Sequence, residues 1–407
     1  MTPIISTTPP PWILPTVSNW LGIRKYYYHP FCEEPVPSIA IVSSKVSRPL
    51  YQQKEWFAKF KQVVTSCLNK ETLILTSPGT TTHRFLQAYS SHHDLRLASA
   101  MICKTSRQWK NKIHNQKAMG RLECLISPPV KIPAGVNQLT DRFPLRDRLL
   151  IGGAHKVCVI NCRHHSQTQQ LLKLRPDSLT YSAFPTAFHS DRSATEISQP
   201  LRQPAVPHWI RNSGTLAHWT RAADCPWPQQ SENSWYNLLI EGQTDADHSA
   251  LATLRNIIHK QRILSSNQTI RGGYKVVCLT ATPLHQWKEL NVYRPHLHRW
   301  DFCPYGLFFS PATVKGFLSK PVRYGDEQLW NSLSQKHKPF FQAIDGNIDW
   351  RMEQEHRVVG DLRLKAFKSE DLVVFVRTES EVAALQPHSI WPVLPFEYLA
   401  GLAKIQK

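Results

Sequence analysis

Two short apolar runs with a helical pattern between them constrain the fold of the N-terminal half most strongly. Residues 39–42 (Ile-Ala-Ile-Val) and 72–75 (Thr-Leu-Ile-Leu) predict buried strands, and residues 55–68 predict a helix. Strands that alternate with helices are typical of a parallel sheet. A further strand is predicted at residues 157–160. We therefore predict an α/β domain with a parallel sheet over residues 37–185.

The remaining parts of the chain have other patterns. Residues 1–36 are rich in proline and aromatic residues and predict an irregular arm that packs on a later surface, with base stacking as the alternative. Residues 186–212 are polar, contain prolines and lack periodicity, which indicates a linker. Residues 213–400 contain many short apolar runs and a few helical patterns. They predict an α+β domain.

A turn rich in serine, threonine and glycine follows the predicted strand at residues 72–75. Such a turn, placed between a strand and a helix, directs backbone N–H groups and hydroxyls at one point, where the helix dipole also favours an anion. An ordinary strand-to-helix turn is the alternative. The candidate phosphate-binding residues, here and in the second half of the domain, are Ser77, Gly79, Thr80, Thr81, Arg146, Gly152 and Gly153.

Three charged residues near the C-terminal end form the main candidate for catalysis. On a strand, Glu353, Glu355 and Arg357 would share one face, and paired carboxylates suit the polarisation of a hydroxyl. On a helix, Glu353 and Arg357 would form a surface pair worth ~0.3–0.5 kcal/mol. Both alternatives are open from the sequence. The strand is favoured because Trp350 precedes the segment and residues 358–360 (Val-Val-Gly) end it.

Charge and cysteine content limit the kinds of partner and the cellular compartment that the chain can have. The net charge of +19 and the pI near 9.6 favour anionic partners such as nucleic acid or nucleotides, with a solvated basic surface as the alternative. Nine scattered cysteines without a C-x-x-C pair indicate free thiols in a reducing cytoplasm. We expect no metal site. We also expect no membrane segment, because no apolar stretch is long enough.

The N-terminal half resembles a known superfamily. The turn Ser77-Pro78-Gly79-Thr80 after a strand, and the arginine-rich segment before the strand at 157–160, resemble the Rossmann-like superfamily that includes DprA and the LOG-type nucleotide hydrolases. The resemblance covers roughly residues 37–180 and implies binding of a nucleotide or nucleic acid. The P-G-G-x-G-T-x-x-E motif of the hydrolases is missing, and His83 stands near the expected glutamate. Hydrolysis at Thr76–Thr82 is therefore only an alternative.

The C-terminal half resembles a family of bacterial defence proteins. The relevant segments are residues 277–284, Tyr305-Gly306, residues 321–324 and the stretch from Trp350 to Arg357. Together they look like the domain of AbiGi-type abortive-infection proteins, over about residues 215–380. This resemblance implies a role in phage defence or as a toxin.

The start of the same domain also resembles the small ADP-ribosyltransferase-like folds of the DarT kind. The similarity lies in His218-Trp-Thr220, a helix, residues 263–266 and a strand with Cys278-Leu-Thr280. In that family a first-strand His or Arg holds the ribose of NAD, and a late Glu activates the acceptor or stabilises the oxocarbenium-like transition state. The resemblance implies NAD binding by His218, Thr220, Arg221, Thr280 and Tyr305, and catalysis by Glu355, Glu353 and His218.

These observations lead to two expectations for function. The first is a cytoplasmic bacterial protein with a nucleotide- or nucleic-acid-sensing module and an effector module that acts as an ADP-ribosyltransferase or NAD glycohydrolase. The second is a non-enzymatic, basic nucleic-acid-binding protein in which the two glutamates only pair with arginines. They differ in what substitution of Glu355 does, because a structural ion pair stabilises the fold and a catalytic carboxylate acts on substrate.

Overall fold

The computed structural model divides the chain into two compact units. The first comprises residues 1–190 and 231–246, and the second comprises residues 191–230 and 247–407. None of the described helices is long and apolar enough to cross a membrane. Most of the predicted linker at 186–212 lies outside the described residues. The structure describes residues 2–30, 36–68, 73–115, 123–130, 142–175, 205–211, 215–268, 270–316, 319–344 and 350–399.

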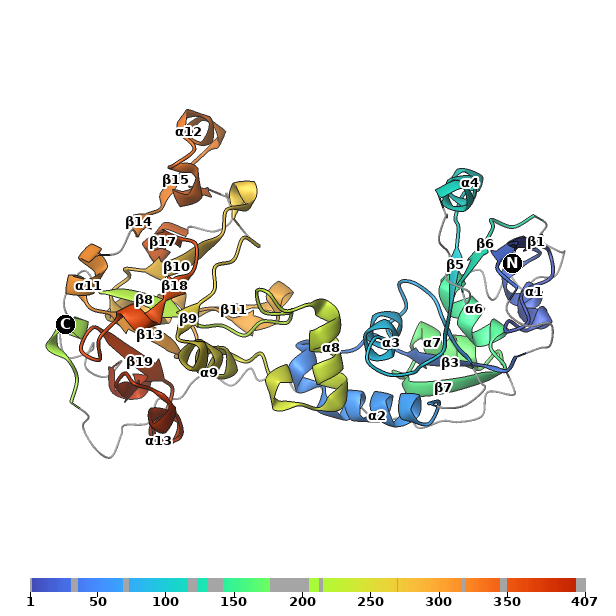
Figure 1. Cartoon of the computed structure of the whole chain (residues 1–407), viewed down its shortest axis with the longest axis horizontal. Helices are drawn as coiled ribbons and strands as arrows, with labels where there is room; N and C mark the ends of the chain where they lie inside the picture. Colours follow the sequence, from blue (N-terminus) through green and yellow to red (C-terminus); the bar gives the residue numbers. More distant parts are fainter. Residues whose placement is uncertain are drawn as a thin grey trace. The chain divides into compact units, whose positions relative to one another are not determined.

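A seven-stranded sheet forms the first unit, with the strand order β1-β2-β6-β5-β4-β3-β7 (Figure 1). Five neighbouring strands are parallel, which confirms the predicted parallel sheet: β3 (Ser38–Ser43), β4 (Leu73–Thr76), β5 (Leu97–Ile102), β6 (Glu123–Ile126) and β7 (Lys156–Asn161). The apolar run at 39–42 lies in β3, and residues 73–75 of the second run lie in the neighbouring strand β4, because both runs are apolar enough to be covered on both faces.

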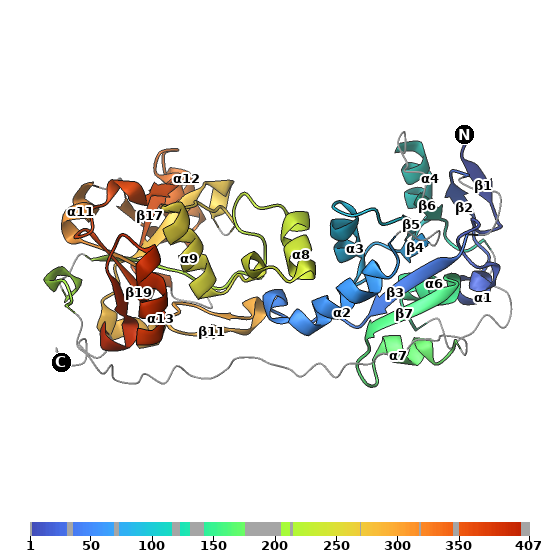
Figure 2. The same ribbon diagram turned by 60° about the horizontal axis from the view of Figure 1, so that its bottom comes forward.

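Helices cover both faces of this sheet (Figures 1 and 2). On one face, α2 (Lys54–Thr65) and α3 (His83–Ser90) bury an aromatic cluster that includes Trp56, Phe60 and Phe85. On the other face, α6 (Leu145–Gly153) and α1 (Ser18–Leu21) contribute to a second core. α4 (Ser106–Asn115) follows β5 and buries none of its residues, and α7 (Gln167–Leu172) follows β7.

The N-terminal arm is more regular than the sequence predicts. β2 (Tyr26–Tyr28) pairs with β6, and β1 (Ile4–Ser6) pairs with β2, both antiparallel. Trp12 and Tyr26 are fully or almost fully buried, so the packing alternative for the aromatic residues is confirmed for these two and base stacking is excluded for them. The expectation of an irregular arm is wrong for Tyr26–Tyr28. Three consecutive tyrosines show no alternation of apolar and polar residues, so the sequence gives no strand signal. They form a strand because they pair with β6.

One helix after the linker belongs to the first unit. α8 (Glu232–Glu241) packs on α2 and α3, where the ring of Tyr236 lies 4.9 Å from that of Phe85 and Lys61 pairs with Glu241 at 2.6 Å. The sequence placed this segment in the domain at 213–400. The structure differs because the apolar face of α8 completes the aromatic cluster of α2 and α3, a match that local patterns do not reveal.

The second unit contains a seven-stranded sheet with the order β14-β17-β10-β8-β13-β19-β20. All neighbouring pairs are antiparallel except β19 with β20. Its strands are β8 (Leu216–Trp219), β10 (Val276–Thr280), β13 (Gly306–Phe309), β14 (Lys320–Pro321), β17 (Glu355–Val359), β19 (Leu372–Val376) and β20 (Val393–Pro395).

Two cores stabilise this sheet. α9 (Ala250–Lys260) and α13 (Glu379–Leu385) pack on one side through Leu254, Ile257 and Leu385. The other side carries a cluster of large rings around Phe375, including Trp219. The smaller elements are β9 (Arg262–Ile263) paired with β18 (Leu362–Arg363), β11 (Tyr293–Arg294) with β12 (Arg299–Trp300), β15 (Arg323–Gly325) with β16 (Phe341–Ala343), α10 (Trp287–Leu290), α11 (Pro311–Gly316) and α12 (Glu327–Ser332).

Candidate functional site

Three neighbouring strands of the second unit bring the predicted catalytic segments together. β17, β10 and β8 are adjacent, and Glu355, Thr280 and Ala217 lie in one row across them. The register between β10 and β8 consists of this one pair, whereas β8 pairs with β13 on its other edge along all four residues. His218 is the next residue of β8. The strand expected for Glu355 to Arg357 is confirmed, and the helical alternative is wrong.

Glu355 forms a buried ion pair with Arg357, two residues further along the same face of β17. Arg357 Nε donates to Oε1 at 2.9 Å and Nη2 donates to Oε2 at 3.0 Å. The other N–H groups of Arg357 donate to the carbonyls of Pro339 and Phe341 and to the side chain of Gln342. All five donors of the guanidinium are thus satisfied. Glu355 has the structural role that the second expectation assigned to both glutamates.

Glu353 has a different environment. It ends the 3₁₀ helix η9 (Trp350–Glu353), so the expectation that it shares the strand with Glu355 is wrong. Thr280 Oγ1 donates to the carbonyl oxygen of Glu353, which ties this turn to β10. The carboxyl group itself has no hydrogen bond or ion pair with any residue that the structure describes. Burial, and then the nearby charge of Glu355, raise its pKa to about 7, although Arg221 acts in the opposite direction.

His218 is held inside the sheet. Its Nδ1 lies 2.9 Å from the carbonyl oxygen of Cys278, and because a carbonyl can only accept, Nδ1 carries the proton. Burial, together with the nearby charge of Arg221, lowers the pKa of His218 to about 4, although the bond to Cys278 works against this shift. The ring is therefore neutral at pH 7, and its Nε2 is left as an acceptor.

The neutral state of His218 predicts a pH dependence of stability. Its pKa of about 4 lies below the ordinary 6.5, so the folded state binds fewer protons than the unfolded state between these values. The contribution of neutral His218 is present above pH 6.5 and is lost as the pH falls towards 4. We expect the unfolding free energy, measured in urea at several pH values, to fall less steeply in His218→Asn than in the wild type. An unchanged slope, equal to that of a variant at the exposed His259, would contradict this assignment.

Three predicted NAD-binding hydroxyls already have structural partners. Thr220 is buried and donates to the carbonyl of Ala250. The hydroxyl of Tyr305 donates to Glu381 at 2.9 Å, and that of Thr280 to the turn at Glu353. Their expected contacts with a ligand are therefore not supported, since each proton serves the fold. The remaining predicted NAD-binding residue, Arg221, is exposed, and its side chain forms no hydrogen bond or ion pair within the described part of the chain.

Sequence reasoning missed several neighbours of the two glutamates. The hydroxyl of Tyr324 accepts a hydrogen bond from the backbone N–H of Glu355 at 3.3 Å. Asp301 is buried and pairs with Arg294 at 3.0 Å and Arg299 at 3.4 Å. The thiol of Cys278 is protonated at neutral pH, because burial, and then Glu355, raise its pKa to about 12. No spacing rule in the sequence indicates these contacts, because they join separate segments.

The candidate phosphate turn of the first unit is formed partly as predicted. Ser77, Thr80 and Thr81 follow β4 and precede α3. Gly79 has a positive φ of 85°, and a Cβ added there would lie 2.7 Å from Nη1 of Arg146, so the arginine lies directly over the turn. However, the hydroxyl of Thr80 donates to the carbonyl of Ser77 within the turn. An ordinary turn and a phosphate site both remain compatible with this geometry.

Gly152 and Gly153 have another role. A Cβ at Gly152 would lie 2.3 Å from the ring of Trp20, and one at Gly153 would lie 3.2 Å from Ile13 and Val17. These glycines let α6 pack closely on the N-terminal segment. They occur at the opposite end of α6 from Arg146, about 9 Å along the helix axis at 1.5 Å per residue. Close packing thus accounts for both glycines, and the geometry gives no support to their assignment as phosphate-binding residues.

Comparisons with known proteins give no further assignment. The chain matches no protein-family model, no curated protein and no solved structure. Among the described residues, no group of three or more His, Cys, Asp or Glu side chains could hold a metal ion.

Proposed function

We propose that the second unit is an NAD-dependent ADP-ribosyltransferase or NAD glycohydrolase, with Glu353 as its acid–base residue. The observation that carries the proposal is the half-buried carboxyl group of Glu353, which has no partner in the described structure and a pKa of about 7. It lies beside three adjacent strands that carry Glu355, Thr280 and His218. General acid–base groups work best with a pKa near the working pH. The resemblance to DarT-type folds supports NAD as the substrate.

In the proposed reaction, Glu353, Arg221 and His218 have different roles. The bond between nicotinamide and the ribose carbon breaks, nicotinamide leaves, and positive charge develops at that carbon. Water or an acceptor hydroxyl attacks the same carbon and gives its proton to Glu353. The exposed side chain of Arg221, which has no partner among the described residues, would contact the phosphates of the dinucleotide. Neutral His218 offers Nε2 as an acceptor for a ribose hydroxyl.

Release of nicotinamide from labelled NAD tests this proposal directly. The full-length protein would be incubated with NAD, with and without DNA and cell extract, and compared with Glu353→Gln. The matched control is Glu370→Gln, because Glu370 is exposed in the same unit. We expect turnover in the wild type and the control and its loss in Glu353→Gln. Absence of turnover in the wild type under all conditions, or full activity of Glu353→Gln, would reject the proposal.

For the first unit we propose a Rossmann-like module that senses a nucleotide or nucleic acid, in a cytoplasmic protein of bacterial phage defence. The five parallel strands have the order β7-β3-β4-β5-β6, in which β4 follows β3 on one side and β7 lies on its other side, and this change in strand order at β3 supports the assignment. The resemblance to the DprA and LOG superfamily and the net charge of +19 support the ligand class. In this proposal the first unit is the sensor and the second unit is the effector, so binding of the ligand to the first unit would regulate the activity of the second.

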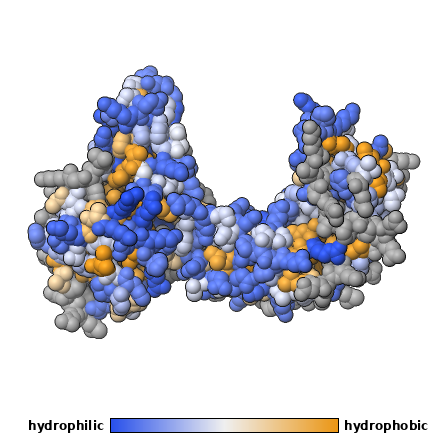
Figure 3. All heavy atoms as spheres, viewed as in Figure 1, coloured by the Kyte–Doolittle hydropathy of each residue, from blue (hydrophilic) through white to orange (hydrophobic). Residues whose placement is uncertain are grey.

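A specific surface favours nucleic acid as a partner of the first unit. α4 buries none of its residues and exposes Arg107, Lys110 and Lys112 without any acidic residue in the helix. Figure 3 shows the hydrophilic surface where α4 projects. Trp109 is half-exposed on the same helix, and aromatic rings beside cations suit single-stranded nucleic acid.

This surface predicts a salt-dependent affinity. We expect alanine at Arg107, Lys110 and Lys112 to weaken binding of a labelled single-stranded oligonucleotide about tenfold, and to reduce the slope of log affinity against log salt by about 2. Fluorescence anisotropy over ~50–200 mM salt measures both quantities. A control with alanine at Lys54, Lys156 and Lys173, which are exposed elsewhere in the unit, should bind as the wild type does. Equal weakening in both variants would show a non-local charge effect.

A further inference from the structure

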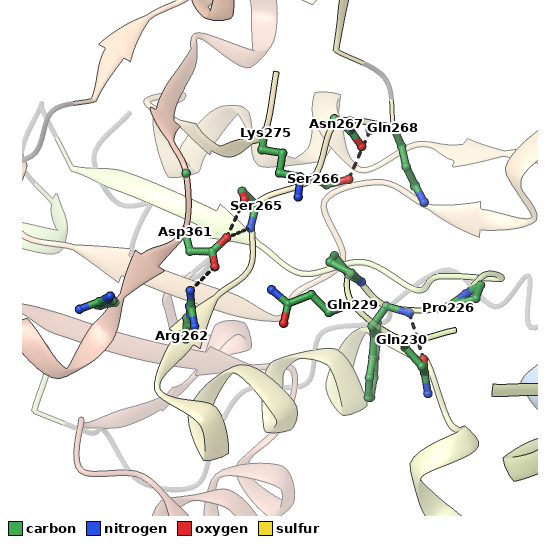
Figure 4. Close-up of a pocket in the computed structure, with 14 residues that line it drawn as sticks. Pro226, Gln229, Gln230, Arg262, Ser265, Ser266, Asn267, Gln268, Lys275 and Asp361 are labelled. Atoms are coloured by element: carbon green, nitrogen blue, oxygen red, sulfur yellow. Dashed lines mark hydrogen bonds and ion pairs between the residues drawn. The ribbon is translucent and has the colours of Figure 1, made fainter. Parts of the chain in front are cut away.

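A polar groove of about 700 Å³ lies in the second unit, away from Glu353 (Figure 4). Three segments line it: the loop of residues 226–230, residues 262–275 around β9, and residues 360–363 after β17. The five residues of β17 separate Glu355 from the groove, because Glu355 begins the strand and the lining residues 360–363 follow its last residue, Val359. At 3.3 Å per residue, Glu355 and Val359 lie about 13 Å apart. The groove is therefore separate from the candidate catalytic cluster.

The negative charge of the acidic residue in the lining, Asp361, is balanced by a neighbouring arginine. Oδ1 of Asp361 accepts from the backbone N–H of Ser265 at 2.7 Å and from its hydroxyl at 2.6 Å. Arg262 pairs with the other oxygen. Burial alone would raise the pKa of Asp361, but the bonds from Ser265 and the charge of Arg262 outweigh it and lower the pKa. Asp361 thus joins two walls of the groove and offers no charge to a ligand.

Two cations of the lining are not paired with an acidic group. The side chains of Lys275 and Arg363 are exposed, and neither side chain forms a hydrogen bond or ion pair with another described residue. The lining therefore has an excess of positive charge, since Arg262 alone balances Asp361. A groove with two unpaired cations favours an anion, and a phosphate group matches both an ammonium and a guanidinium.

The remaining lining residues suit the rest of a small polar molecule. Four amide side chains, each both donor and acceptor, come from two facing segments: Gln229, Gln230, Asn267 and Gln268. Figure 4 shows them around the same opening as Lys275. The ring of Trp227 stacks on His248 at 4.0 Å, which fixes the loop that carries the first two amides. The groove volume of about 700 Å³ lies in the range of small-molecule sites, ~300–1,000 Å³.

We propose that this groove binds a phosphate ester of nucleotide size, with its phosphates on Lys275 and Arg363 and its polar ring edges on the amides. The donor and acceptor pairs of glutamine and asparagine match those of a heterocyclic base. Gln230 accepts from the backbone N–H of Trp227, and Asn267 and Gln268 each donate one bond within the protein, which leaves the other amide atoms for a ligand. An apolar ligand would leave those remaining atoms unpaired and is disfavoured. The proposal does not depend on the reaction proposed for Glu353.

Binding of ADP to the full-length protein, measured by isothermal titration calorimetry, tests the groove. We expect the double variant Lys275→Ala/Arg363→Ala to bind ADP at least tenfold more weakly than the wild type. The matched control is Lys365→Ala/Lys368→Ala, because both lysines are exposed nearby but do not line the groove. Glu353→Gln should bind ADP as the wild type does, so a failure of the NAD reaction leaves this result unaffected. No binding of ADP, or equal binding by the groove variant and the wild type, would overturn the proposal.

Discussion

Glu353→Gln is expected to lower the rate of nicotinamide release by about 10²–10⁴-fold, the usual contribution of a general acid–base residue. Glutamine has the shape of glutamate but can neither accept a full proton nor carry charge. The backbone carbonyl that holds the turn to Thr280 is unchanged by this substitution. The loss should therefore appear in the rate of the chemical step, with the fold intact.

The same substitution should stabilise the protein at alkaline pH. The pKa of Glu353 is about 7, above the ordinary 4.5, so the folded state holds more protons than the unfolded state between these values. The contribution of protonated Glu353 is full below pH 4.5 and is lost as the pH rises through 7. Above pH 7 the variant avoids a half-buried charge, and we expect a gain of about 1 kcal/mol.

Urea unfolding at pH 5 and pH 8 separates these effects. The wild type and Glu353→Gln should differ little at pH 5, and the variant should be the more stable at pH 8. A variant that loses activity and is less stable at both pH values would show that Glu353 has a structural role and would contradict the assignment of an acid–base residue. The exposed Glu370→Gln variant provides the reference for the loss of one surface charge.

Glu355→Gln is expected to destabilise the protein by about 3 kcal/mol, because it removes one partner of a buried ion pair. The side chain of Arg357 is 1% exposed and would keep its charge without the carboxylate at 2.9 Å. The carbonyls of Pro339 and Phe341 and the amide of Gln342 would remain as its partners, but none of them is charged.

Chemical unfolding at pH 7 measures this cost. A double variant, Glu355→Gln/Arg357→Met, removes both charges and should recover a large part of the lost stability, since the buried guanidinium is then absent. A fully stable but inactive Glu355→Gln would be the opposite result. It would transfer the catalytic role to Glu355 and leave Arg357 as its positioning residue.

The sequence predicts the strand elements better than the site. The apolar runs at 39–42 and 157–160 are strong local signals, and both form strands of the parallel sheet. The two valines after Arg357 likewise favour a strand, because valine has a high β-propensity, and β17 is found at Glu355–Val359. By contrast, the sequence offers Gly152 as a candidate phosphate-binding residue, whereas its packing neighbour Trp20 comes from a segment about 130 residues earlier in the chain.

The sequence by itself determined the parallel sheet, the basic charge and the presence of two carboxylates beside an arginine, because periodicity, composition and spacing are local properties. Only the tertiary structure decided which carboxylate is engaged. Glu355 and Arg357 share a strand face, while Glu353 is tied through its backbone to Thr280, so its carboxyl group is left without a partner among the described residues. The burial of a carboxyl group and its pairing with a cation both set its charge state, and both depend on segments far apart in the chain.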